Sequence, residues 1–123
     1  MITLKGEFDR VWPWLEKAVF HSREPFTAEE VWQRIEDDMA QLWSAHDAAA
    51  VTTIQVFPNG QKAIQIWLAG GSMDSVIRIT GFVEEWAKLK GAKSVTIVGR
   101  RGWLRALNGY DEVATCMMKE LKQ

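Results

Sequence analysis

The amino-acid sequence predicts a single α/β domain over residues 1–123, with a mixed, mostly antiparallel sheet of about six strands and helices on both faces. Three observations lead to this fold class. A helix-start signal stands at Thr27–Glu30, and a β-branched run over 48–57 is followed by an Asn-Gly turn and an apolar return. A long apolar-faced segment over 73–90 then ends at Gly91, and a second β-branched run follows it.

The first third is predicted to be mainly helical. Residues 1–4 suit a short edge strand, and Asp9 can cap a helix from Arg10 to about Phe20, with Pro13 in its first turn. In the capping box at Thr27, the Thr27 hydroxyl accepts a hydrogen bond from the Glu30 amide, and the Glu30 carboxylate accepts one from the Thr27 amide. The box begins a helix that we expect to continue to about Met39.

The middle of the chain changes to the two-residue period of strands. We expect a short strand over 41–44, a second over 48–57 and a return strand over 62–68, with the turn at 58–61. Asn59-Gly60 suits the positive φ angles of a hairpin turn. Together these segments predict an antiparallel meander, which ends at 69–72.

The last third is predicted to add helix, strand, helix and strand. Ser72 caps a long helix over 73–90, and the dense apolar run at 93–98 suggests a central, buried strand. A short basic helix over 100–107 and a turn at 108–110 lead to a last strand over 113–121.

Composition limits the possible classes of protein. Apolar residues make up 47% and charged residues 25% of the chain, as in ordinary globular domains. No apolar run approaches the ~20 residues that span a bilayer, and no secretory signal follows Met1, so we expect a cytoplasmic protein without a membrane partner. Cys116 is the single cysteine, which excludes an internal disulfide.

Charge is distributed unevenly although the net charge is −1. Residues 1–47 hold ten acids and five bases, whereas residues 48–123 hold six acids and ten bases, so the halves carry −5 and +4. The two halves can face each other or only solvate the surface. Alternatively, the arginines after residue 99 form a basic face for an anionic partner.

The order of the predicted elements, together with the turn Leu107-Asn-Gly-Tyr110, resembles a GCN5-related N-acetyltransferase (GNAT) domain over essentially the whole chain. The resemblance implies the GNAT fold and, in active members, acetyl-coenzyme A held at the start of the long helix. The chain also resembles, in overall character, small phage-encoded proteins of this fold. That second resemblance implies a location in the host cytoplasm or in a virion.

The family's coenzyme A loop would correspond to Gly70, Gly71 and Ser72. Two glycines allow close approach, and free amides at a helix start attract a pyrophosphate. The loop is several residues shorter than the family's, and Asp74 adds a negative charge in the first helical turn. The same residues also fit a plain strand-to-helix turn capped by Ser72.

No catalytic residue and no metal ligand set emerge from the sequence. Counting back five positions from Tyr110, where many family members place a tyrosine acid, reaches Arg105, which cannot donate a proton at neutral pH. His21 and His46 are isolated, and Cys116 lies on the predicted last strand, where this family places no catalytic group.

The segment Gly99-Arg-Arg-Gly-Trp103 suggests a contact for a partner. Arg100, Arg101, Trp103 and Arg105 can bind an acidic protein or a phosphate. In the other interpretation, the arginines pair with the acidic helices and Trp103 fills the core. Nucleic-acid binding is not indicated, because the overall charge is near zero and no recognition motif is present.

These observations favour a non-catalytic GNAT-like module for interaction or assembly, with a protein partner or a second copy, in a phage particle or its construction. The alternative is a divergent acetyl-CoA-dependent N-acetyltransferase that uses Gly70, Gly71 and Ser72. A third hypothesis is a small inhibitor of a host enzyme. The alternative requires an open cleft beside the strand that ends near Leu68, without capping by Ser72 and Asp74 and without Trp67 filling it.

Overall fold

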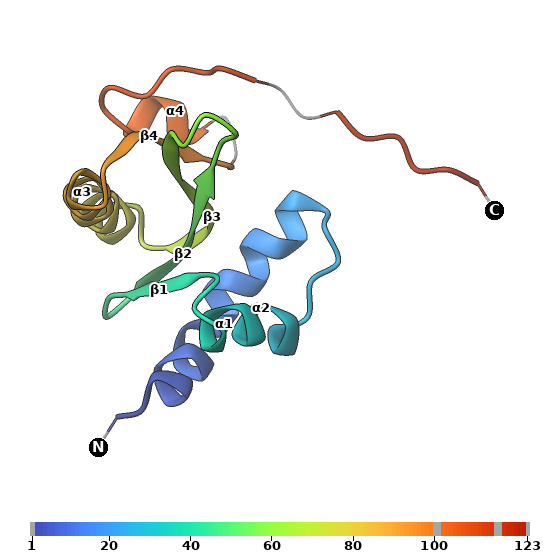
Figure 1. Ribbon diagram of the computed structural model, residues 1–123. Coiled ribbons are helices and arrows are strands. Elements are labelled where there is room, and N and C mark those ends of the chain that lie inside the picture. The colour runs from blue at the N-terminus through green and yellow to red at the C-terminus, as the bar shows by residue number, and fades with distance from the viewer. Residues whose placement is uncertain (1, 100–101, 115–116, 123) are drawn as a thin grey trace.

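The computed structural model describes residues 2–99, 102–114 and 117–122. These residues form one four-stranded sheet with helices on both faces (Figure 1). The helices are α1 (Leu4–Ser22), α2 (Ala28–Glu36), α3 (Met73–Leu89) and α4 (Gly102–Ala106). The strands are β1 (Gln41–Ser44), β2 (Ala48–Val56), β3 (Lys62–Gly71) and β4 (Ala92–Ile97), in the sheet order β1-β2-β3-β4. The predicted antiparallel meander is confirmed, and β4 joins β3 in parallel.

The α1 helix begins earlier than predicted. The Thr3 hydroxyl, rather than Asp9, caps it by accepting the Gly6 amide at 2.9 Å, so residues 2–4 form no strand. Pro13 therefore lies inside the helix. The helix continues past Pro13 because four apolar side chains on one face are buried against the sheet: Phe8, Val11, Leu15 and Val19.

The capping box of α2 is confirmed in both directions. The Glu30 amide lies 3.1 Å from Thr27 Oγ1, and Glu30 Oε1 accepts the Thr27 amide at 2.9 Å. The helix ends at Glu36, three residues before the predicted end, and Asp38 then takes a left-handed conformation with φ 59°. That turn directs the chain into β1.

Two apolar cores lie on opposite faces of the sheet. Helices α1 and α2 cover one face, whose core includes Trp67 and Leu68 of β3. Helices α3 and α4 cover the other, whose core includes Ile64, Ile66 and Trp103. All seven tryptophans are buried or half-buried, so the structure has no tryptophan-rich exposed patch. The buried face of α3 does not take in all of its large apolar side chains, since Ile77, Phe82 and Leu89 are exposed.

The prediction of six strands is wrong for the described residues, which contain four. β4 was expected to be central, but it lies at the sheet edge. The described residues of 113–121 make no ladder with it, and residues 115–116 lie outside the described part. Figure 1 shows this segment leaving the domain in an extended path, and Glu120 pairs with Arg23 at the end of α1 rather than with β4.

No helix among the described residues is long and apolar enough to cross a membrane.

A pH-dependent contact ties the start of α1 to β1. The Glu7 carboxylate accepts hydrogen bonds from the Arg10 guanidinium at 2.8 Å and from the Ser44 hydroxyl at 2.7 Å. These bonds lower the pKa of Glu7 from 4.5 to about 2. Arg10 also donates to the carbonyl oxygens of Ala45 and His46, so the group fixes the turn between β1 and β2.

We expect Glu7→Gln to flatten the acid limb of the stability curve. A carboxyl whose folded pKa is lowered stabilises the fold above its unfolded pKa of 4.5, and this contribution disappears as the pH falls toward about 2. The measurement is the free energy of unfolding in denaturant at several pH values between these limits. Glu16→Gln, at an exposed position of the same helix, is the matched control. An unchanged slope for Glu7→Gln would contradict the assignment.

Candidate ligand cleft

The sheet opens between β3 and β4. β4 follows β3 as far as Ile66, whose carbonyl oxygen accepts the Val98 amide at 3.2 Å. β3 then continues to Gly71 beside β2 alone. Because β4 ends at Ile97, the partner of Ile66, the end of β3 beyond Ile66 has no β4 residue paired with it, which leaves a gap at the carboxyl end of the parallel pair.

A β-bulge at Trp67 coincides with this opening. Val51 pairs with Leu68 and Thr52 pairs with Ile66, so Trp67 is an extra residue in β3. A bulge bends its strand and increases the local twist, and bulges often lie next to active sites. The Trp67 side chain packs edge-on against Phe26, with ring centroids 4.9 Å apart, on the side covered by α1 and α2.

The gap forms a cleft of about 1120 Å³. Its walls come from the carboxyl-terminal half of α1, the ends of β3 and β4, Trp103 of α4 and the segment after Tyr110. On the α1 side the rim carries Lys17, His21 and Arg23, together with Glu24. The C-terminal segment contributes Glu112, Ala114 and Met118 to the lining.

Gly70 and Gly71 are the last residues of β3 and pair with β2, so they are strand residues rather than a loop. A Cβ atom on Gly70 would overlap the Trp14 carbonyl of α1, and one on Gly71 would overlap Asp47 and Ala48. Gly71 also has φ 109°. Close packing of the backbone therefore accounts for both glycines without any ligand.

The start of α3 follows β3 after one residue, Ser72. Ser72 lies at the N-cap position but forms no side-chain cap hydrogen bond, so the predicted serine cap is not seen. Instead, the Ser75 hydroxyl donates to the Asp47 carboxylate, which lowers the pKa of Asp47. The Ser72 amide donates to the Asp47 carbonyl at 2.9 Å. A negative side chain thus already stands at the helix end where a pyrophosphate would bind.

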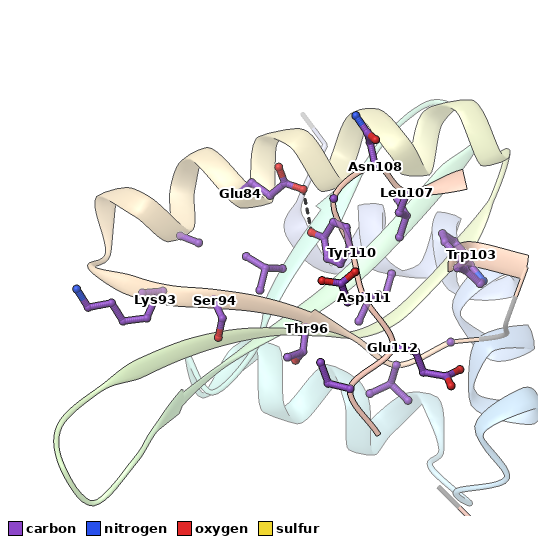
Figure 2. A pocket seen from close by; sticks show the side chains of 18 of the residues that line it. Glu84, Lys93, Ser94, Thr96, Trp103, Leu107, Asn108, Tyr110, Asp111 and Glu112 are labelled. Carbon is purple, nitrogen blue, oxygen red and sulfur yellow. Dashed lines mark hydrogen bonds between the residues drawn. The ribbon is translucent and has the colours of Figure 1, made fainter. Parts of the chain in front are cut away.

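A second hollow of about 1010 Å³ lies on the outer side of β4 and is shown in Figure 2. The Tyr110 hydroxyl donates to the Glu84 carboxylate of α3 at 2.8 Å. Burial and this neighbouring carboxylate raise the pKa of Tyr110, so the phenol stays protonated at neutral pH. The contact anchors the turn that leads into the C-terminal segment.

The residues predicted to bind a partner do not form one exposed group in the described part of the chain. Trp103 is only 8% exposed and belongs to the α3-side core, as the core interpretation expects. Arg105 is exposed on α4. Arg100 and Arg101 lie outside the described residues. No group of acidic, histidine or cysteine residues in the described part could hold a metal ion.

Sequence reasoning missed three features of the cleft: the bulge at Trp67, the Asp47 carboxylate at α3 and the Arg23 side chain at the rim. The strand pattern around Trp67 shows no break that marks a bulge, and Asp47 reaches α3 only through the tertiary fold. Arg23 gave no signal either, because the helix was predicted to end at about Phe20 and only the structure places Arg23 directly after it.

Comparison with known proteins shows similarity in fold at low sequence identity. A probable acetyltransferase superposes with a TM-score of 0.71 at 10% identity, over 98% of this chain and 94% of that chain. A transcriptional regulator from Bacillus halodurans C-125 superposes with a TM-score of 0.69 at 13% sequence identity, over 98% of this chain and 97% of that chain. A ribosomal-protein-alanine N-acetyltransferase from Brucella melitensis biovar Abortus 2308 superposes with a TM-score of 0.62 at 14% sequence identity, over 92% of this chain and 94% of that chain. No protein-family model and no curated protein matches the chain.

The chain therefore has a GNAT acetyltransferase-like fold. None of the three structures named above is described as a phage protein, so the resemblance to phage proteins gains no support from them.

Proposed function

We propose that the chain is a divergent N-acyltransferase-type domain that receives an acyl thioester in the cleft between β3 and β4. The single observation that carries the proposal is the coincidence of the Trp67 bulge with the opening of the sheet. The opening leaves a cleft beside the ends of two strands, which suits a chain with amide groups such as the pantetheine arm of coenzyme A.

The residues present fit only part of coenzyme A. The arm suits the cleft, whose lining includes the end of β3 from Ala69 to Gly71 and the residues Val98 and Gly99 after β4. The diphosphate does not fit at the position that the family resemblance implies, because Gly70 and Gly71 are packed against backbone and Asp47 stands at the start of α3. We therefore expect no affinity from diphosphate contacts at Gly70, Gly71 and Ser72.

Calorimetric titration with acetyl-CoA and with S-acetyl-pantetheine tests this proposal. Both ligands should bind with dissociation constants within a factor of about three of each other, a difference below ~1 kcal/mol, because the shared arm carries the affinity. A much lower dissociation constant for acetyl-CoA than for S-acetyl-pantetheine would show that the protein does bind the diphosphate. Absence of heat with both ligands at millimolar concentration would reject the thioester site.

A second candidate is the non-catalytic interaction or assembly module, which a different observation favours. The C-terminal segment exposes Val113, Met117 and Leu121 at 84%, 89% and 75%. Exposed apolar side chains on an extended segment suit a protein partner or a second copy of the chain. If neither thioester binds, and light scattering shows an oligomer that Met117→Lys dissociates, this candidate replaces the first.

A further inference from the structure

The end of α1 carries an arginine where the backbone favours glycine. Arg23 caps the helix with φ 61° and ψ 17°, in the left-handed region, and its amide donates to the Phe20 carbonyl at 3.2 Å. Glycine adopts this conformation without steric cost, whereas a residue with a Cβ atom is strained there. An observed outlier of this kind points to a role for the side chain itself.

The Arg23 side chain lies at the rim of the cleft and already holds a carboxylate. Its Nη2 atom is 2.8 Å from Glu120 Oε1 of the C-terminal segment. Both side chains remain well exposed, at 62% for Arg23 and 76% for Glu120. Exposed ion pairs are weak, so a carboxylate from solution can displace Glu120.

The surroundings of Arg23 supply both signs of charge. His21, in the last turn of α1, and Lys17, about one turn earlier, line the same rim, and Glu24 and Glu112 also line the cleft. A guanidinium offers a planar pair of donors that matches a carboxylate better than a lysine does. The acidic residues suit the positive amine that such a ligand would carry.

We propose that Arg23 recognises the side-chain carboxylate of an acceptor amine, a compound of the class of acidic amino acids or peptides, and that Glu120 occupies this position until the acceptor binds. This inference rests on the proposed function only where it treats the ligand as the acceptor of an acyl group. The recognition of a carboxylate itself requires only the cleft.

Nuclear magnetic resonance titration of the whole chain with L-glutamate tests the proposal, with L-glutamine as the neutral match. We expect the Arg23 amide and side-chain signals to shift with glutamate and not with glutamine. Glu120→Gln should tighten glutamate binding about 1.5- to 5-fold, the range set by the strength of an exposed ion pair. Equal responses to both amino acids, or none to glutamate at high millimolar concentration, would overturn the proposal.

Two variants separate recognition from folding. Arg23→Gly should abolish the glutamate response while the melting temperature stays equal or rises, because the strain at φ 61° is relieved. Lys62→Gln, which removes one exposed positive charge at the start of β3, is the control and should bind as the unaltered chain does. Retained binding in Arg23→Gly would reject the assignment. The titration contains no thioester, so its failure is distinguishable from failure of the proposed function.

Discussion

Gly70→Ala is expected to destabilise the domain by about 3 kcal/mol, a size typical of forced overpacking against backbone. The new Cβ would overlap the carbonyl oxygen of Trp14 in α1, and a backbone atom cannot rotate away as a flexible side chain can. Helix α1 would have to shift from β3, which would loosen the core that the two elements share. Denaturant unfolding measured by tryptophan fluorescence gives the value.

Gly81→Ala is the matched control within the same domain. Gly81 lies exposed inside α3, and an added Cβ would meet nothing within 4 Å. Alanine should therefore stabilise the domain by about 0.5–1 kcal/mol through its higher helix propensity. If Gly70→Ala left stability unchanged and weakened only thioester binding, the glycine would serve the ligand, and the structural explanation would be wrong.

Trp103→Ala is expected to lower the free energy of unfolding by about 3–5 kcal/mol, as for other buried tryptophans. α4 spans only five residues, too few to form a stable helix alone, so its docking depends on Trp103 and Leu107 in the α3-side core. Thermal unfolding followed by circular dichroism provides the measurement.

Arg105→Ala on the same helix is the control and should change stability by less than about 0.5 kcal/mol, because the side chain is exposed. The pair also separates the two interpretations of the basic segment. If Trp103 were a surface contact for a partner, Trp103→Ala would leave stability intact. A large loss of stability in Trp103→Ala but not in Arg105→Ala would assign the tryptophan to the core and restrict any partner surface to the arginines.

Local signals in the sequence predicted the elements that depend on neighbouring residues. The Thr27–Glu30 capping box is present in both directions, because its partners are three positions apart in the chain. The Asn59-Gly60 turn and the strands beside it also agree, with φ 85° at Gly60. The predicted start of α1 was wrong because Thr3 caps the helix six residues before Asp9, and the helical turn that this adds buries Phe8.

The number of strands and the candidate cleft could not be predicted in this way. A run such as 113–121 has strand composition, but a strand also needs a neighbour, and composition does not say whether one is within reach. The bulge at Trp67 is a shift of one residue in the register between β2 and β3. The alternation of apolar and polar residues within each strand does not show where such a shift occurs.

The sequence by itself determined the α/β class, the antiparallel meander and the long helix after it, because each follows from spacing within a few residues, whereas the link predicted over 69–72 is only Ser72. The tertiary structure decided what that link can bind. It packed Gly70 against α1, brought Asp47 to the start of α3 and opened β3 from β4 at Trp67. These contacts join residues far apart in the chain, and their geometry is fixed only when both cores close on the two faces of the sheet.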